Sequence, residues 1–186
     1  MNEPPTPSAQ PEHTVCYTLE ATLLSGPVED SFFEDNPVIS RTIQIRGDQT
    51  LEGLHDIIFT AFDREDDNAY EFRMSGGPHD QTTRIYVLPS ELFRKPLKNR
   101  SIAGDVTRTR IDALGLKEDD IFTYWFDFEN DWTHQITVVS VDGEIPRGKL
   151  PRVISRIGES PAQYGDMDGE ESDLEFSEDE LWNVSY

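Results

Sequence analysis

The stretch IFTYWFDFENDWTHQITVVSV, residues 121–141, carries the strongest indication of the fold. Aromatic and β-branched residues fill seven of its first eight positions, and residues 132–141 alternate apolar with polar side chains, as a half-buried strand does. The polar residues Glu129, Asn130 and Asp131 make a connection of hairpin length between the two halves. The sequence therefore predicts an antiparallel pair of strands whose aromatic side chains enter the core.

Outward from this hairpin, other short segments show the same strand signals of alternation, β-branched residues and flanking turn residues. Pro151 places the last of these segments at a sheet edge, because proline cannot donate a hydrogen bond within a ladder. Residues 25–37 predict a loop, and Gly76-Gly77-Pro78 predicts the turn of a second hairpin. The further strands are predicted at residues 15–24, 38–46, 69–74, 83–88 and 149–157.

One long helix is predicted, because Leu51, Leu54, Ile58 and Phe62 recur at helical spacing after a capping residue, Asp48 or Thr50. The polar residues that follow it, DREDDN at 63–68, predict a turn. Since strands otherwise follow strands, the order of elements indicates an α+β fold, with a mostly antiparallel sheet packed against one main helix.

Composition limits the classes of function. The chain has 186 residues, 37 acidic and 16 basic, and a formal net charge of −21. Like charges repel the phosphate backbone, so general nucleic-acid binding is disfavoured. No apolar run reaches the ~18 residues of a membrane-spanning helix, so we expect no membrane association. Cys16 is the only cysteine, which excludes an intramolecular disulfide, and without a visible secretory signal we expect a cytoplasmic protein.

The two ends differ in composition from the middle of the chain. Residues 1–14 are rich in proline and polar residues, and residues 166–186 hold nine acids and no base, so we expect both to be disordered around one domain at 15–165. The acidic tail either keeps the chain soluble or docks on a basic partner through DLEFSEDELW, residues 173–182.

The motif FDFENDWTH, residues 126–134, concentrates the residues capable of chemistry. It places carboxylates near an imidazole, and Trp132 and His134 share one face of a strand because side chains alternate. Three interpretations remain open: the polar residues form only the turn and core, they line a binding cleft, or Asp127 and His134 act with a divalent metal in hydrolysis. The phosphate-binding loops, the nucleophile elbow and the H-E-x-x-H motif are absent, and we expect no cofactor.

Further residues extend these interpretations. His55, beside Leu54 on the helix, is either a boundary histidine or converges with His134 on one ligand or metal. Residues 94–110 hold six bases and one acid, Asp105, and form either a solvated loop or a site for a small acidic ligand or for DNA.

At this motif the chain resembles the pRi plasmid ORF-3-like family, also described as insertion-element passenger proteins of TnpR type. FDFENDWTH is similar to the family signature Y-D-F-G-D-x-W-x-H, with Glu129 and Asn130 replacing its Gly-Asp pair. A glycine there adopts positive φ at low cost and Glu129 does not. TLEGLHDIIFTAF (50–62) resembles the family's T-L-x-x-L-H helix, VISRTIQI (38–45) keeps an arginine at Arg41, and Asn68 replaces a common histidine.

The resemblance covers roughly residues 15–165 and implies a compact α+β domain, found on plasmids and near insertion elements, with no established activity. We therefore expect a non-catalytic binding or interaction module, with Asp127, Trp132 and His134 at a pocket and His55 and Arg41 as its neighbours. Its partner would be a protein or a small acidic ligand. The alternatives are a metal-assisted hydrolase or nuclease-like enzyme using Asp127 and His134, and an accessory DNA-associated protein.

Overall fold

The computed structural model describes residues 14–74, 83–92 and 100–164. The predicted Gly76-Gly77-Pro78 turn, the predicted acidic tail and almost all of the predicted lead lie outside these ranges, as do residues 94–99 of the basic run.

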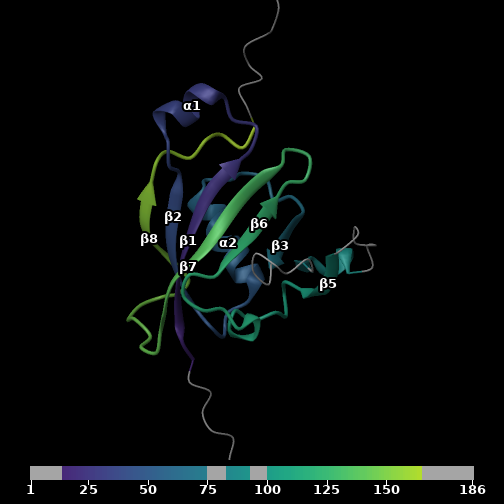
Figure 1. The fold of residues 1–186 in the computed structure, drawn as a ribbon, viewed down its shortest axis with the longest axis vertical. Helices are drawn as coiled ribbons and strands as arrows, with labels where there is room; N and C mark the ends of the chain where they lie inside the picture. The colour runs from purple at the N-terminus through teal and green to yellow at the C-terminus, as the bar shows by residue number, and fades with distance from the viewer. Residues whose placement is uncertain (1–13, 75–82, 93–99, 165–186) are drawn as a thin grey trace, which may run out of the picture.

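Eight strands form a single mixed sheet in the order β5-β4-β3-β6-β7-β1-β2-β8 (Figure 1). Neighbouring strands are antiparallel except for β4 and β5, which run parallel. β8 lies at one edge, as Pro151 predicted, and the strand pairing β3–β4 confirms the second hairpin. The strands are β1 (Cys16–Ser25), β2 (Ser40–Arg46), β3 (Tyr70–Met74), β4 (Thr83–Val87), β5 (Arg100–Asp105), β6 (Ile121–Phe126), β7 (Trp132–Asp142) and β8 (Arg152–Ile157).

Helices are a minor part of the described chain: α1 (Asp30–Asp35), α2 (Leu51–Ala61) and the 3-10 turns η1 (Pro89–Glu91) and η2 (Asp112–Leu114). The expected mostly antiparallel sheet is thus a β-rich mixed sheet, and one main helix is too simple a description. α1 occupies the segment predicted as a loop. α2 begins after Thr50, whose hydroxyl oxygen accepts a hydrogen bond from the Gly53 amide at 3.2 Å, so Thr50 is the cap.

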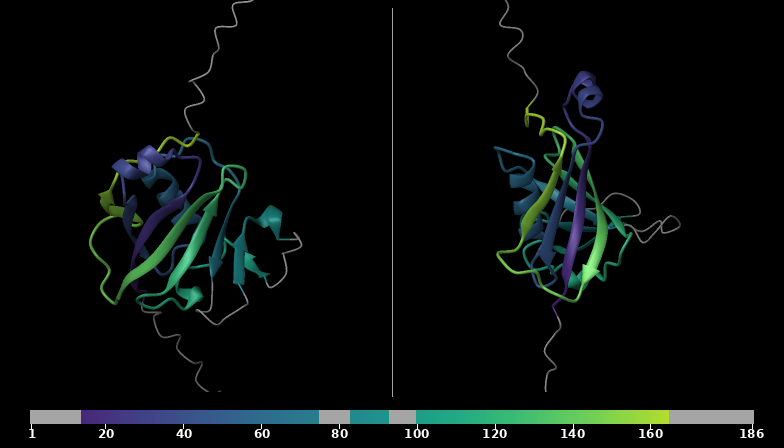
Figure 2. Two further views of the ribbon diagram at one scale, coloured as in Figure 1. Left: turned by 45° about the horizontal axis from the view of Figure 1, so that its top comes forward. Right: turned by 90° about the vertical axis from the view of Figure 1, so that its left-hand side faces the viewer.

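The core lies between α2 and the sheet face that it covers (Figure 2). Leu51, Leu54 and Ile58 of α2 are buried against this face. The aromatic hairpin supplies much of the opposing surface, because Tyr124 pairs with His134 and Phe126 pairs with Trp132 across β6 and β7. No helix of the described ranges is long and apolar enough to span a bilayer.

The connection between β6 and β7, residues 127–131, is here called the hairpin tip. It is longer than the predicted three-residue turn. Its positive φ angles fall on Asp127 (52°) and Asp131 (54°), and Glu129 does not adopt one. Aspartate tolerates this region better than most residues, so the Glu129 substitution in the family signature does not strain the turn.

Candidate functional site

Trp132 lies on the inner face of β7 and is completely buried. Its indole Nε1 donates a hydrogen bond to the backbone carbonyl of Gln163 at 3.1 Å. The guanidinium carbon of Arg64 lies 3.6 Å from the centre of the ring, a cation–π contact. Trp132 therefore joins the hairpin to two segments that are far away in sequence.

His134 lies two residues further along the same face and is 1% exposed. Its ring packs edge-on against Phe62, with 4.7 Å between centroids, and lies 5.4 Å from the ring of Tyr124. Neither ring nitrogen has a hydrogen-bond partner in the part of the chain that the structure describes. Burial, reinforced by the nearby charge of Arg64, lowers the pKa of His134 to about 3, so the imidazole is neutral at physiological pH.

Asp127 is buried at the hairpin tip, where its Oδ2 accepts hydrogen bonds from the side-chain amides of Asn68 (3.0 Å) and Asn130 (2.8 Å). Its backbone amide donates to the carbonyl of Ala69 at 2.9 Å. Asp127 and His134 share none of these partners, so the structure does not join them as a carboxylate–imidazole pair. Asn68, which replaces a histidine of the family pattern, instead fixes the tip to the turn after α2.

A surface hollow of about 310 Å³ opens beside the hairpin tip. Asp127 forms part of its wall, and so does Tyr164, whose hydroxyl donates to the Asp66 carboxylate at 2.9 Å. The residues that line the hollow are Asn68, Ala69, Asp127, Phe128, Glu129, Asn130 and Tyr164.

His55 is buried on α2 between two polar partners. Its Nδ1 lies 2.8 Å from the hydroxyl of Tyr124, and its Nε2 lies 3.3 Å from a carboxylate oxygen of Asp67, which is exposed. The ring stacks on Tyr70 at 3.7 Å. Burial lowers the pKa of His55, and the Asp67 carboxylate acts in the opposite direction.

His55 and His134 thus both contact the ring of Tyr124. Their ring nitrogens share no polar partner among the described residues. Within the described ranges, no group of three or more histidine, cysteine or acidic side chains is placed to hold a metal ion.

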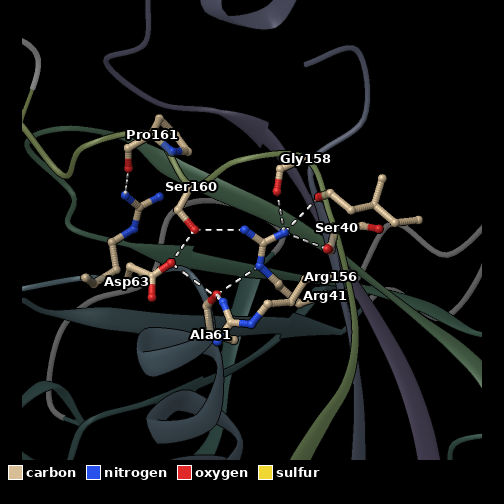
Figure 3. Close-up of polar contacts among 10 residues, drawn as sticks. Ser40, Arg41, Ala61, Asp63, Arg156, Gly158, Ser160 and Pro161 are labelled. Atoms are coloured by element: carbon tan, nitrogen blue, oxygen red, sulfur yellow. Dashed lines mark hydrogen bonds and ion pairs between the residues drawn. The ribbon is translucent and has the colours of Figure 1, made fainter. Parts of the chain in front are cut away.

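Arg41 belongs to a different cluster, at the C-terminal end of α2 (Figure 3). It is 2% exposed, and its Nε donates to the carbonyl of Ala61 at 2.9 Å. Nη1 donates to the carbonyl of Ile157 at 2.7 Å, and Nη2 to the hydroxyl of Ser160 at 2.8 Å. Arg41 therefore ties β2 and α2 to residues 158–164, here called the closing segment.

Arg64 is the functional candidate that the sequence did not reveal. It stands in the predicted polar turn, yet it is 7% exposed. Its Nη1 donates to the carbonyl of Pro161 at 2.9 Å, while Nε and Nη2 are buried without a hydrogen-bond partner in the described ranges. Burial lowers its pKa to about 10, which leaves the guanidinium charged at neutral pH. A lone arginine among acids is typical of a solvated turn, so no local pattern signals this burial.

The basic run is only partly a loop. Its residues 100–105 form the edge strand β5, which runs parallel to β4. Beyond β5, Nη2 of Arg110 lies 2.6 Å from a carboxylate oxygen of Asp112, and the Arg108 amide donates to the Asp105 side chain at 3.0 Å. In this part of the run, nearby acids therefore balance some of the positive charge.

The model of the plasmid pRiA4b ORF-3-like protein family matches residues 31–180. The chain belongs to this family. The resemblance inferred from the FDFENDWTH motif is thereby confirmed. No curated protein matches the chain.

The crystal structure of a protein of unknown function from Methanosarcina mazei Go1 has a similar fold, with a TM-score of 0.58 and 16% sequence identity. The match covers 81% of this ORF-3-like chain and 73% of the other. At this identity the likeness concerns the fold alone.

In this ORF-3-like protein, the signature residues Asp127, Trp132 and His134 are all buried. Each contacts a segment distant in sequence: Asp127 the turn after α2, Trp132 the closing segment, and His134 the end of α2. The signature therefore marks where the hairpin, α2 and the closing segment meet.

Proposed function

We propose that this ORF-3-like protein is a non-catalytic binding or interaction module, and that the hollow beside the hairpin tip is its recognition surface. The observation that carries the proposal is the hollow itself, a concave surface of about 310 Å³ in which a buried carboxylate, Asp127, is held in place by two amides. Concave surfaces with a few fixed polar groups are typical ligand sites.

The charge of the hollow selects the chemistry of the partner. Asp127 and Glu129 line it, and Asp66 lies against Tyr164 at its edge. These carboxylates favour a ligand with a cationic group, such as a lysine or arginine side chain of a partner protein. The net charge of −21 also attracts a basic partner over a long range. The proposal therefore names a basic protein segment as the ligand class.

The proposal includes a cytoplasmic location. Cys16 is buried and free in the structure, which agrees with a reducing compartment.

The catalytic alternative has no comparable support. A general base must reach the proton that it removes, whereas both nitrogens of His134 are buried and the Asp127 carboxylate already accepts two hydrogen bonds. DNA association is not favoured either, because Arg110 is paired with Asp112 and the chain is strongly acidic.

The test measures binding of a lysine-rich peptide to the full chain by fluorescence anisotropy, beside the same peptide with acetylated lysines. We expect Glu129→Gln to weaken binding several-fold, while Glu118→Gln, an equal charge change at an exposed site outside the hollow, leaves the affinity unchanged. Equal affinity of the two variants, or equal binding of the acetylated peptide, would refute the proposal.

A further inference from the structure

Arg64 is a buried cation that has no counter-ion among the residues the structure describes. Within the described ranges, no carboxylate lies at ion-pair distance from its guanidinium. The carboxylate of Asp63 acts on the Arg64 charge from a distance, but it already accepts a hydrogen bond from Ser160 at 2.7 Å and lies 3.6 Å from Arg156. Burying a charge costs free energy unless the charge is paired. We therefore expect an anionic partner for Arg64.

The unpartnered atoms of Arg64 form one edge of the guanidinium. Nε–H and one Nη2–H point in parallel, and this fork matches the two oxygens of a carboxylate or phosphate. Arg46 shows the same edge in use, with Nε at 2.8 Å and Nη2 at 3.2 Å from the two carboxylate oxygens of Asp48. Arg152 uses it on the side-chain oxygen of Gln44, at 3.0 and 2.7 Å.

His134 lies beside this cation. Arg64 covers the ring of Trp132, and His134 follows Trp132 by two residues on the same face of β7. The Arg64 charge acts on the imidazole strongly enough to contribute to its lowered pKa. Both ring nitrogens of His134 lack a hydrogen-bond partner among the described residues, as do two nitrogens of Arg64. Four buried polar atoms of two side chains that both adjoin Trp132, one over its ring and one two residues along β7, are therefore without a partner in the described ranges.

An ordered water would satisfy some of these atoms, but it would leave the charge of Arg64 unpaired. An oxyanion satisfies both requirements, because its oxygens accept from the fork and from a neutral imidazole N–H while its charge compensates the guanidinium. Nearby Arg41, which also has no carboxylate partner in the described ranges, favours negative charge in the same region.

We propose that the Nε–Nη2 edge of Arg64 and the imidazole of His134 together form a binding site for a small oxyanion, a carboxylate or a phosphate group. The site is distinct from the hollow at the hairpin tip and has the opposite charge preference. The closing segment covers it, since the carbonyls of Pro161 and Gln163 accept from Arg64 and Trp132. Entry of an anion therefore requires this segment to lift.

The first experiment uses the unmodified full chain. Formate and inorganic phosphate are titrated separately at constant ionic strength, set with chloride, while nitrogen-15 NMR follows the imidazole of His134. We expect a saturable shift of the His134 ring signals with one or both anions, and the anion that saturates at the lower concentration identifies the class. The absence of a saturable shift with both anions overturns the proposal, and so does an equal response to chloride.

The second experiment measures the melting temperature of variants with the same anions. Arg64→Lys keeps the charge but loses the fork, so we expect an affinity at least about tenfold weaker. Arg46→Gln removes one exposed positive charge and should retain the full response. An anion response equal in Arg64→Lys and the unmodified chain assigns the binding to another surface and overturns the proposal. Should Arg64→Lys not fold, His134→Gln replaces it, with the same expected loss.

Discussion

Replacing His134 with phenylalanine should remove much of the acid sensitivity of this fold. In the folded chain the pKa of His134 is lowered from 6.5 to about 3, because the imidazole is buried and Arg64 is close. The unfolded chain therefore binds a proton on this residue at a pH where the folded chain does not. The resulting stability is fully present above about pH 6.5 and is lost as the pH falls toward about 3.

The size of the effect follows from these two pKa values. Between about pH 7 and about pH 5, His134 alone lowers the free energy of unfolding by about 2 kcal/mol, and by about pH 4 the loss reaches about 3 kcal/mol. This is a large part of the stability of a small domain. Phenylalanine does not titrate, so this contribution to the pH dependence disappears in His134→Phe.

The assay is urea unfolding at a series of pH values in buffers without carboxylate or phosphate. The slope of unfolding free energy against pH should be smaller for His134→Phe than for the unmodified chain. Phe122→Leu, a substitution at another buried position on the same sheet face, is the control, since it lowers stability without removing a titrating group. If all three proteins show the same slope between about pH 7 and about pH 5, the reasoning about His134 is wrong.

Two further predictions concern single contacts and use urea unfolding at neutral pH. Tyr124→Phe should cost about 1–3 kcal/mol, because it leaves the buried Nδ1 of His55 without its partner; an unchanged midpoint would contradict this. Gly158 has φ of +69°, and a Cβ there would lie 2.5 Å from the carbonyl oxygen of Val38, so Gly158→Ala should cost about 2–5 kcal/mol. Gly115 has the same φ with no neighbour within 4 Å, so Gly115→Ala should cost only about 1–2 kcal/mol; equal costs would exclude the clash.

The elements predicted from local pattern are those in which one face is buried continuously. β1 and β7 alternate because every second residue enters the core, and α2 shows a helical stripe for the same reason. The local sequence is therefore enough to predict these elements. α1 and β5 give no such signal, because α1 has no buried residue and β5 lies at the edge of the sheet.

The candidate site was only partly predictable, because a local sequence pattern does not indicate which distant segments contact one another. The shared face of Trp132 and His134 follows from alternation within one strand, and it is confirmed. The proximity of Asp127 and His134 in sequence did not make them partners, since the tip turns Asp127 toward Asn68. Arg64 belongs to the site because the closing segment packs over it. The carbonyl that accepts from Arg64 is that of Pro161, 97 positions later in the chain.

The position of β1 inside the sheet, between β7 and β2, has a consequence for the order of events during synthesis. β1 pairs with β7, so Cys16 meets Asp142 and Ser25 meets Thr133 across most of the length of the domain. On the ribosome, β1 leaves the exit tunnel long before β7 has been synthesised. Such high contact order slows folding. β2 can pair with one edge of β1 early, but the other edge of this apolar strand stays unpaired until β7 emerges.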